Sequence, residues 1–393
     1  MIRRTLAAAV LVLAAACASA PATVLPKPDA NGTYLFWTPD EQLAGYRNIE
    51  KIFPTRTIKR GSHVAPLPKA GKELVVAYDD KGVAMTTESF MERAKAAGVL
   101  VIHKDKVVLE RYAHGYGPGQ RWTSFSMGKS ISSTLAGAAL KEGKIRSLQD
   151  KVTDYLPGLK GSAYDGVTVY QLLTMTTGVK WNETYADPNS DVGRIRSSKT
   201  ADGSDPIVAY MSKLERIAEP GTVWRYNTGE THLIGSLVRA ATGKPLAEYL
   251  SEKIWKPYGM EKDAVWLLDT SGGEYAGCCI SATLRDFGRF AVFFKNGAKV
   301  DGVSIVPDGW VKDATTPTAI SKERGRGYGY QWWTNGGPRY FQANGIFGQT
   351  IQFDTVDDTI VVIQSYWPSS GDAASAAARA AFIEAAQAAA RNP

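Results

Sequence analysis

The sequence predicts an α+β protein in which one antiparallel sheet, flanked by helices, carries an inserted all-helical lobe. A hairpin pattern at residues 99–112 and strand patterns after residue 325 lie on either side of a helical stretch at 144–299. Strands from both ends of a chain that flank a helical middle assemble most simply as one sheet. We therefore expect a sheet lobe from residues 99–143 and 300–393, a helical lobe from 144–299, and an active site between them. A chain of 393 residues is long enough for two such lobes.

The N-terminus has the pattern of a bacterial export signal. In MIRRTLAAAVLVLAAACASAPA, an Arg pair precedes a short apolar run and a string of small residues. Leu13–Cys17 resembles a lipobox, so we expect residues 1–16 to be removed and Cys17 to be lipidated. The alternative is cleavage after Ala18-Ser19-Ala20, which Pro21 at the next position disfavours. Either cut predicts an exported protein, periplasmic or anchored to the outer membrane of a bacterium by an N-terminal lipid.

The region before the hairpin has little periodicity. Residues 17–98 are rich in Pro and Gly, so we expect a linker and an extended arm that ends in a short helix near residues 89–98. The hairpin itself is a strong signal, because the runs Val99–His103 and Val107–Tyr112 lie on either side of Lys104-Asp105-Lys106.

Helical periodicity marks the next elements. After Ser126, the apolar residues Ile131, Leu135 and Ala138 recur at helical spacing until Gly143. This pattern predicts a buried helix whose N-terminus can open on a cleft. Further helices are expected at 164–178, 231–243, 245–255 and 283–297.

The last part of the chain changes to strand patterns. GYGYQWWT, RYFQANGIFGQTIQFD and DTIVVIQSYW alternate or run apolar, with a turn at Asp357-Asp358. The Ala-rich tail from Asp372 to Arg391 predicts a final helix. These strands and the early hairpin together supply the expected sheet.

Composition excludes several function classes. The formal net charge of +7 comes from Lys and Arg mixed with acidic residues, without the basic patch that nucleic-acid binding requires. The adjacent Cys278 and Cys279 are expected to be two buried thiols, because neighbouring cysteines rarely pair. The histidines show no metal-ligand spacing, and we expect neither a metal nor another cofactor. These histidines are His63, His103, His114 and His232.

The stretch SFSMGKS, residues 124–130, carries the first chemical signal. Ser126 and Lys129 are three residues apart and therefore lie on one side of a helix, one turn along. A neutral Lys129 amine could accept the proton that a Ser126 hydroxyl loses when it attacks a carbonyl, provided that the site lowers the lysine pKa toward about 7–8. The same spacing also arises from a Ser helix cap followed by a solvated Lys.

Three motifs resemble those of the class C β-lactamase-like serine hydrolases. They are SFSMGKSISSTLAG, YDGVTVYQLLTMTTGVKW and GTVWRYNTGETHLIG, and the likeness extends from about Asn31 onward. The chain is most similar to the esterase and amidase branch that includes 6-aminohexanoate-dimer hydrolase. This resemblance implies a β-lactamase/penicillin-binding-protein-like fold, Ser126 as the nucleophile and Lys129 as its partner.

The resemblance also implies a role for Tyr226. This residue stands before an expected helix, whose positive end and the nearby Lys129 would favour a phenolate that moves protons. The alternative is a core Tyr. The family motif is usually Tyr-x-Asn, whereas this chain has Thr228 in the third position, so the substrate-holding role of that residue is open.

The third family element departs from the β-lactamase pattern. Where β-lactamases have a Lys or His before x-Gly, this chain has Ala343, so no cation stands there to bind the carboxylate of a β-lactam. The same strand can still supply the Ile346 N–H, which would form an oxyanion hole with the Ser126 N–H. Four substrate contacts are also expected: Trp181, Tyr185, Asn344 and Gly345.

These observations predict a serine hydrolase that cleaves small esters or amides through an acyl-enzyme on Ser126, activated by Lys129 and Tyr226. The alternatives are a β-lactamase, or a penicillin-binding or sensor protein that acylates without turnover. A Ser-His-Asp hydrolase is disfavoured because the last histidine, His232, lies within a helical pattern far from the C-terminus. The expected partner is a small molecule, with the membrane reached only through the lipid on Cys17; the oligomeric state stays open.

Overall fold

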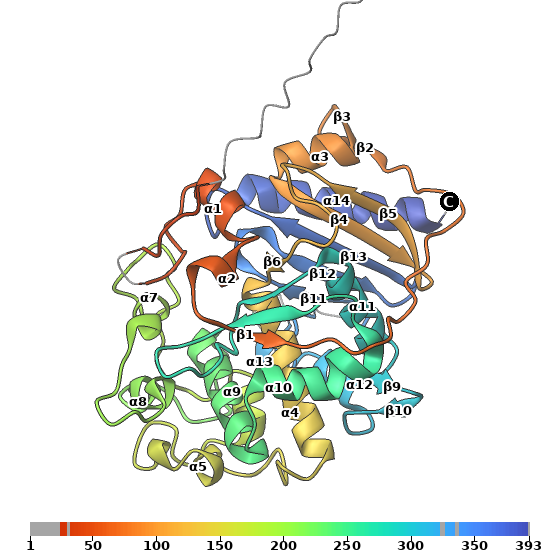
Figure 1. The fold of residues 1–393 in the computed structure, drawn as a ribbon. Helices are drawn as coiled ribbons and strands as arrows, with labels where there is room; N and C mark the ends of the chain where they lie inside the picture. The colour runs from red at the N-terminus through yellow and green to blue at the C-terminus, as the bar shows by residue number, and fades with distance from the viewer. Residues whose placement is uncertain (1–23, 30–31, 323–326, 335–337, 392–393) are drawn as a thin grey trace, which may run out of the picture.

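The computed structural model describes residues 24–29, 32–322, 327–334 and 338–391 (Figure 1). The expected signal segment and the lipidation site at Cys17 lie outside these residues. Within the described ranges, no helix has both the length and the apolar character needed to cross a bilayer.

The main sheet has five antiparallel strands in the order β11-β12-β13-β4-β5. Both ends of the chain contribute to it, as the sequence predicted. The predicted hairpin is present, but its turn has two residues, because Lys106 pairs with His103 and belongs to β5, while Lys104 and Asp105 both have a positive φ. The strands are β4 (Ala96–His103), β5 (Lys106–Tyr112), β11 (Tyr340–Asn344), β12 (Thr350–Asp354) and β13 (Thr359–Ser365).

Helices cover both faces of this sheet (Figure 1). On one face, α3 (Thr87–Arg93) and α14 (Ala373–Arg391) meet through Phe90 and Phe382, whose rings stack at a centroid distance of 4.1 Å. On the other face lies α11 (Leu284–Lys295). Side chains of β4 alternate between the two cores, as strand geometry requires.

A second, smaller sheet was not predicted. Its order is β1-β7-β8-β6, with β1 (Thr55–Ile58), β6 (Trp122–Thr123), β7 (Ala264–Leu267) and β8 (Ile280–Ala282). The region expected to be an extended arm therefore contributes a strand to this sheet, and the segment 144–299, which was expected to be all-helical, contributes β7 and β8. It also forms α1 (Pro39–Gly45), α2 (Ile49–Ile52) and a hairpin of β2 (Ala77–Asp80) and β3 (Val83–Thr86).

The helical lobe is built around two long helices, α4 (Gly128–Lys141) and α9 (Thr228–Thr242), which pack against each other. Gly243, with φ 69°, ends α9 as expected. The shorter helices around them are α5 (Val152–Tyr155), α6 (Val169–Leu173), α7 (Asp191–Arg194), α8 (Pro206–Met211) and α10 (Leu246–Leu250). A π-helical segment, Ser251–Gly259, continues α10.

Two local expectations were wrong. The helix expected to run to Gly178 is the five-residue α6, because Met175 and Gly178 both adopt a positive φ. Residues 327–334 form isolated bridges instead of a strand. The strand pattern RYFQANGIFGQTIQFD forms β11 and β12, which are separated by a turn at Ile346–Gly348. Short elements complete the chain: β9 (Lys299–Val300), β10 (Val303–Ser304), α12 (Trp310–Ala314) and α13 (Ala319–Lys322).

Replacing Phe382 by Ala should lower the free energy of unfolding by about 3–5 kcal/mol, because the ring is fully buried between α14 and the sheet. Denaturant unfolding followed by circular dichroism measures the change. Val356→Ala is the control, since Val356 is 68% exposed, and it should alter the free energy by less than about 0.5 kcal/mol. Equal losses in the two variants would contradict this packing of α14.

Candidate active site

Ser126 lies in a tight turn that leads into α4. The turn, Phe125–Met127, is a single 3₁₀ turn, and Phe125 has a φ of 45°, a conformation that non-glycine residues rarely adopt. Aromatic contacts hold the Phe125 ring in place, at centroid distances of 5.3 Å to Tyr34 and 4.8 Å to Tyr46. This arrangement presents Ser126, which is 8% exposed, at the head of a buried helix.

Lys129 is one turn further along α4 and its amine contacts the serine. The Lys129 Nζ atom lies 3.1 Å from the Ser126 Oγ, 3.0 Å from the Thr228 Oγ1 and 2.6 Å from the Gly277 carbonyl oxygen. Lys129 is 1% exposed, and burial lowers the pKa of its amine to about 7, against the opposing charge of Glu183. A substantial share of the amine is therefore neutral near pH 7 and able to accept a proton from Ser126.

Tyr226 stands immediately before Asn227, the N-cap of α9, at the same cleft. Its ring stacks on Trp333 at a centroid distance of 5.4 Å, and the Lys129 amine is 5.3 Å from the ring centroid. The expectation of a phenolate was wrong. Burial first, and then the charge of Glu183, raise the pKa of Tyr226, while hydrogen bonds from Ser126 and Thr228 only partly oppose them. Tyr226 is accordingly a neutral phenol that can donate a proton.

Glu183 is a site residue that the sequence analysis missed. Its carboxylate accepts hydrogen bonds from the Thr228 backbone N–H at 3.0 Å, the Thr228 hydroxyl, the Trp181 indole N–H and the Tyr185 hydroxyl. Thr228 thus connects the Lys129 amine to a carboxylate. An acidic residue in a polar loop carries no sequence signal of this role, although Thr228 was already marked by its departure from Tyr-x-Asn.

The two expected oxyanion donors belong to segments that are locked together. The turn after β11 places Phe347, which has a φ of 63°, against the Phe125 ring at a centroid distance of 5.3 Å. Gly345 permits this approach, since a Cβ atom there would lie 2.5 Å from the Ser124 carbonyl oxygen. In the described part of the chain, no backbone carbonyl accepts a hydrogen bond from the N–H of Ser126 or Ile346. Both donors are therefore available to a developing oxyanion.

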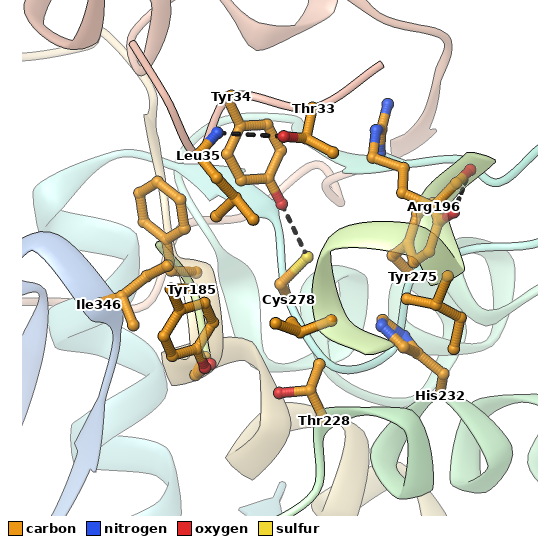
Figure 2. Close-up of a pocket in the computed structure, with 14 residues that line it drawn as sticks. Thr33, Tyr34, Leu35, Tyr185, Arg196, Thr228, His232, Tyr275, Cys278 and Ile346 are labelled. Carbon is orange, nitrogen blue, oxygen red and sulfur yellow. Dashed lines mark hydrogen bonds between the residues drawn. The ribbon is translucent and has the colours of Figure 1, made fainter. Parts of the chain in front are cut away.

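Two cavities meet at Ser126. An enclosed pocket has a volume of about 50 Å³, and an open groove has a volume of about 1130 Å³. Tyr185 and Ile346 line both cavities, whereas Tyr226 lines only the groove. Figure 2 shows the enclosed pocket, with Ile346 and Tyr185 on one side and Tyr275 and His232 on the other.

The four expected substrate contacts separate into two groups. Tyr185, Asn344 and Gly345 line the groove. Trp181 lines neither cavity: it is 3% exposed, and its indole N–H supports the Glu183 carboxylate instead of facing a substrate.

The adjacent cysteines form a disulfide, so the expectation of two thiols was wrong. Cys279 has a φ of 74°, a left-handed backbone conformation that the sequence does not indicate. The segment around the disulfide belongs to the site, because the Gly277 carbonyl accepts from Lys129 and the Ile280 N–H donates to the Ser124 Oγ at 3.1 Å. Among the described residues, no cluster of His, Cys, Asp and Glu is suited to holding a metal ion.

Comparison with known proteins identifies the family of the chain. The family model described as "Beta-lactamase" matches residues 83–386, most of the chain. The chain belongs to the β-lactamase family. The predicted α+β fold of the β-lactamase/penicillin-binding-protein type is therefore confirmed.

The chain is 30% identical to a 6-aminohexanoate-dimer hydrolase of Paenarthrobacter ureafaciens, over 82% of this chain and 85% of that protein. It is 26% identical to the esterase EstB of Burkholderia gladioli, over 45% of this chain and 49% of the esterase. A solved structure from Bacillus anthracis, described as a candidate 6-aminohexanoate-dimer hydrolase, has the same fold. Its TM-score is 0.78 at 24% identity, with 88% of this chain and 94% of that one covered.

The disulfide predicts the thiol count of the protein. Alkylation with iodoacetamide under denaturing, non-reducing conditions should leave the peptide that contains Cys278 and Cys279 unmodified, and prior reduction should add two carbamidomethyl groups. Mass spectrometry of the tryptic peptide reads this out. Cys278→Ser is the control, since it should leave Cys279 alkylated without reduction. Alkylation of both cysteines in the unreduced protein would contradict the disulfide.

Proposed function

We propose that the protein is a serine hydrolase that cleaves small esters or amides through an acyl-enzyme on Ser126. The observation that carries the proposal is the buried Lys129 amine, 3.1 Å from the Ser126 Oγ, with its pKa lowered to about 7. A solvated lysine of ordinary pKa would be protonated and could not act as the base.

In acylation, the Ser126 oxygen attacks the substrate carbonyl carbon while its proton passes to the Lys129 amine. The carbonyl oxygen becomes an oxyanion that accepts hydrogen bonds from the Ser126 and Ile346 N–H groups. Removing one donor of this kind typically costs about 3 kcal/mol of transition-state stabilisation.

The tetrahedral intermediate then expels its leaving group. Tyr226, a neutral phenol at the groove, donates its proton to the departing oxygen or nitrogen, and the Lys129 ammonium restores the phenol proton. In deacylation, water attacks the acyl carbon, its proton follows the reverse route, and Ser126 recovers its hydroxyl. Ser126, Lys129 and Tyr226 therefore regain their starting protonation states after one turnover.

The substrate class follows from the third family element and from the relatives. Ala343 is a buried apolar residue at the position where β-lactamases carry a cation, which disfavours a β-lactam carboxylate. The relatives named for a linear amide dimer and for esters support an ester or amide substrate. A β-lactamase, and a penicillin-binding or sensor protein without turnover, are the alternatives that the assays below distinguish.

A fluorophosphonate probe should label Ser126 alone, as read by mass spectrometry of the labelled peptide. Ser126→Ala should abolish labelling and reduce ester hydrolysis by at least about a thousandfold. The control is Ser204→Ala, because Ser204 is exposed and lines neither cavity. Labelling at another residue would overturn the nucleophile assignment.

Steady turnover is expected on p-nitrophenyl esters and on a linear amide dimer, with slower turnover of a chromogenic cephalosporin. A single burst of one equivalent would instead identify an acylated sensor. A cephalosporin preferred by orders of magnitude would identify a β-lactamase and would overturn the interpretation of Ala343.

The pH profile tests Lys129 as the base. The kcat/KM should rise with pH through about 7, because the amine must lose its proton to accept one from Ser126. Glu183→Gln removes a negative charge that raises the pKa of Lys129, so the midpoint should move to lower pH. The control Glu215→Gln alters an exposed carboxylate paired with Lys180 and should leave the midpoint unchanged. An upward shift in Glu183→Gln would contradict this electrostatic role.

A further inference from the structure

The charged residues that line the enclosed pocket beside Ser126 are of one sign only. Its lining includes one charged side chain, Arg196, and contains no Asp or Glu. The remaining lining residues are Thr33, Tyr34, Leu35, Phe125, Ser126, Tyr185, Val192, Ile195, Thr228, His232, Tyr275, Cys278 and Ile346. A substituent that enters this pocket therefore meets a positive charge without a compensating carboxylate in the wall.

The Arg196 guanidinium has no ion-pair partner among the described residues. Its Nε–H donates to the Gly32 carbonyl, and its carbon Cζ lies 4.6 Å from the Phe53 ring centroid and 5.2 Å from that of Tyr275. These contacts hold the cation beside the pocket without an ion pair.

The charge of Arg196 acts on the groups that face the pocket. It lowers the pKa of Tyr34 and of Tyr275, although burial is the larger influence and raises both. It also contributes, after burial, Lys129 and Arg239, to lowering the pKa of His232. Asp29 opposes Arg196 at Tyr34, and Asp269 and Asp205 oppose it at Tyr275, but Arg196 has the larger electrostatic effect on both groups.

His232 adds a hydrogen-bond donor to the same wall (Figure 2). The Gly277 backbone N–H donates to its Nδ1 atom at 3.1 Å, so the neutral imidazole must carry its proton on Nε2. Because burial keeps the ring neutral, this tautomer offers an N–H donor to whatever occupies the pocket.

The two cavities differ in their relation to the reacting bond. Tyr226, the proposed acid for the leaving group, lines the groove and not the enclosed pocket. The leaving group must therefore occupy the groove, where Arg379 and Glu384 supply charges of both signs. The acyl chain is left with the enclosed pocket.

We propose that the enclosed pocket is the acyl subsite and that Arg196 selects short acyl chains that end in a carboxylate, while it disfavours chains that end in a cation. The inference rests on the proposed function and adds the substrate class to it. Arg196 is in this view a specificity-determining residue, since it contacts the far end of the acyl chain and takes no part in proton transfer.

Matched p-nitrophenyl esters test the inference. The glutarate monoester is compared with the neutral pentanoate, and the 4-(trimethylammonio)butyrate with its neutral isostere 5,5-dimethylhexanoate. In the wild-type protein, kcat/KM should favour the anionic over the neutral ester by at least about tenfold, as expected for a charged hydrogen bond. The cationic ester should be cleaved several times more slowly than its isostere.

Arg196→Gln should bring both ratios toward one, and Arg196→Lys should retain part of the preference for the anion. Arg194→Gln is the matched control, because Arg194 is exposed on the preceding turn and does not line the pocket, and both ratios should persist. Using ratios within each variant separates specificity from any general loss of activity or folded protein.

Equal rates on the charged and neutral esters, or a preference for the cation, would overturn the inference even if Ser126 is labelled and turnover is steady. A wild-type protein that hydrolyses none of the esters and is not labelled at Ser126 would instead overturn the proposed function. The two failures are therefore distinguishable without relying on the stability of any Arg196 variant.

Discussion

The burial of one amine organises the centre of this protein. Lys129 lies almost without solvent contact inside α4, and its three hydrogen-bond partners come from three different parts of the chain. A full charge at such a depth is costly, which lowers the amine's proton affinity into the neutral range. The negative charge of Glu183 opposes that decrease, so the pKa of the amine is about 7 and both protonation states are populated near neutral pH. The turn at Ser126, the start of α9 at Thr228 and the disulfide segment at Gly277 each supply one hydrogen-bond partner of this amine.

Much of the framework could be predicted from the sequence because it follows from short-range periodicity. The helix after Ser126 places a lysine one turn away whatever else the chain does, and the hairpin at residues 104–105 follows from local turn chemistry. The final helix and the individual strands are equally local in origin, and the order of the elements along the chain favoured one sheet made from both ends. Residue-by-residue likeness to a known family added Tyr226, which no spacing rule would have selected among 18 tyrosines.

What could not be predicted depends on contacts between distant segments. Glu183 reaches Thr228 across 45 positions of sequence. The small sheet joins β1 to β7, two segments with little strand pattern of their own. The protonation state of Tyr226 could not be predicted, because the sequence indicates the helix N-terminus that favours a phenolate but does not indicate the burial that raises the pKa of the phenol. The pairing of Cys278 with Cys279 was also not predicted, since it occurs together with a left-handed backbone at Cys279 that the sequence does not indicate.

The stretch before residues 83–386, the span shared with the family model, contributes to the site in two ways. Thr33, Tyr34 and Leu35 close one side of the enclosed pocket. Tyr34 also packs against Phe125, in the turn that carries Ser126. Replacement of Thr33 or Leu35 among relatives would therefore alter which molecules fit the pocket, whereas replacement of Tyr34 would also remove support from the nucleophile.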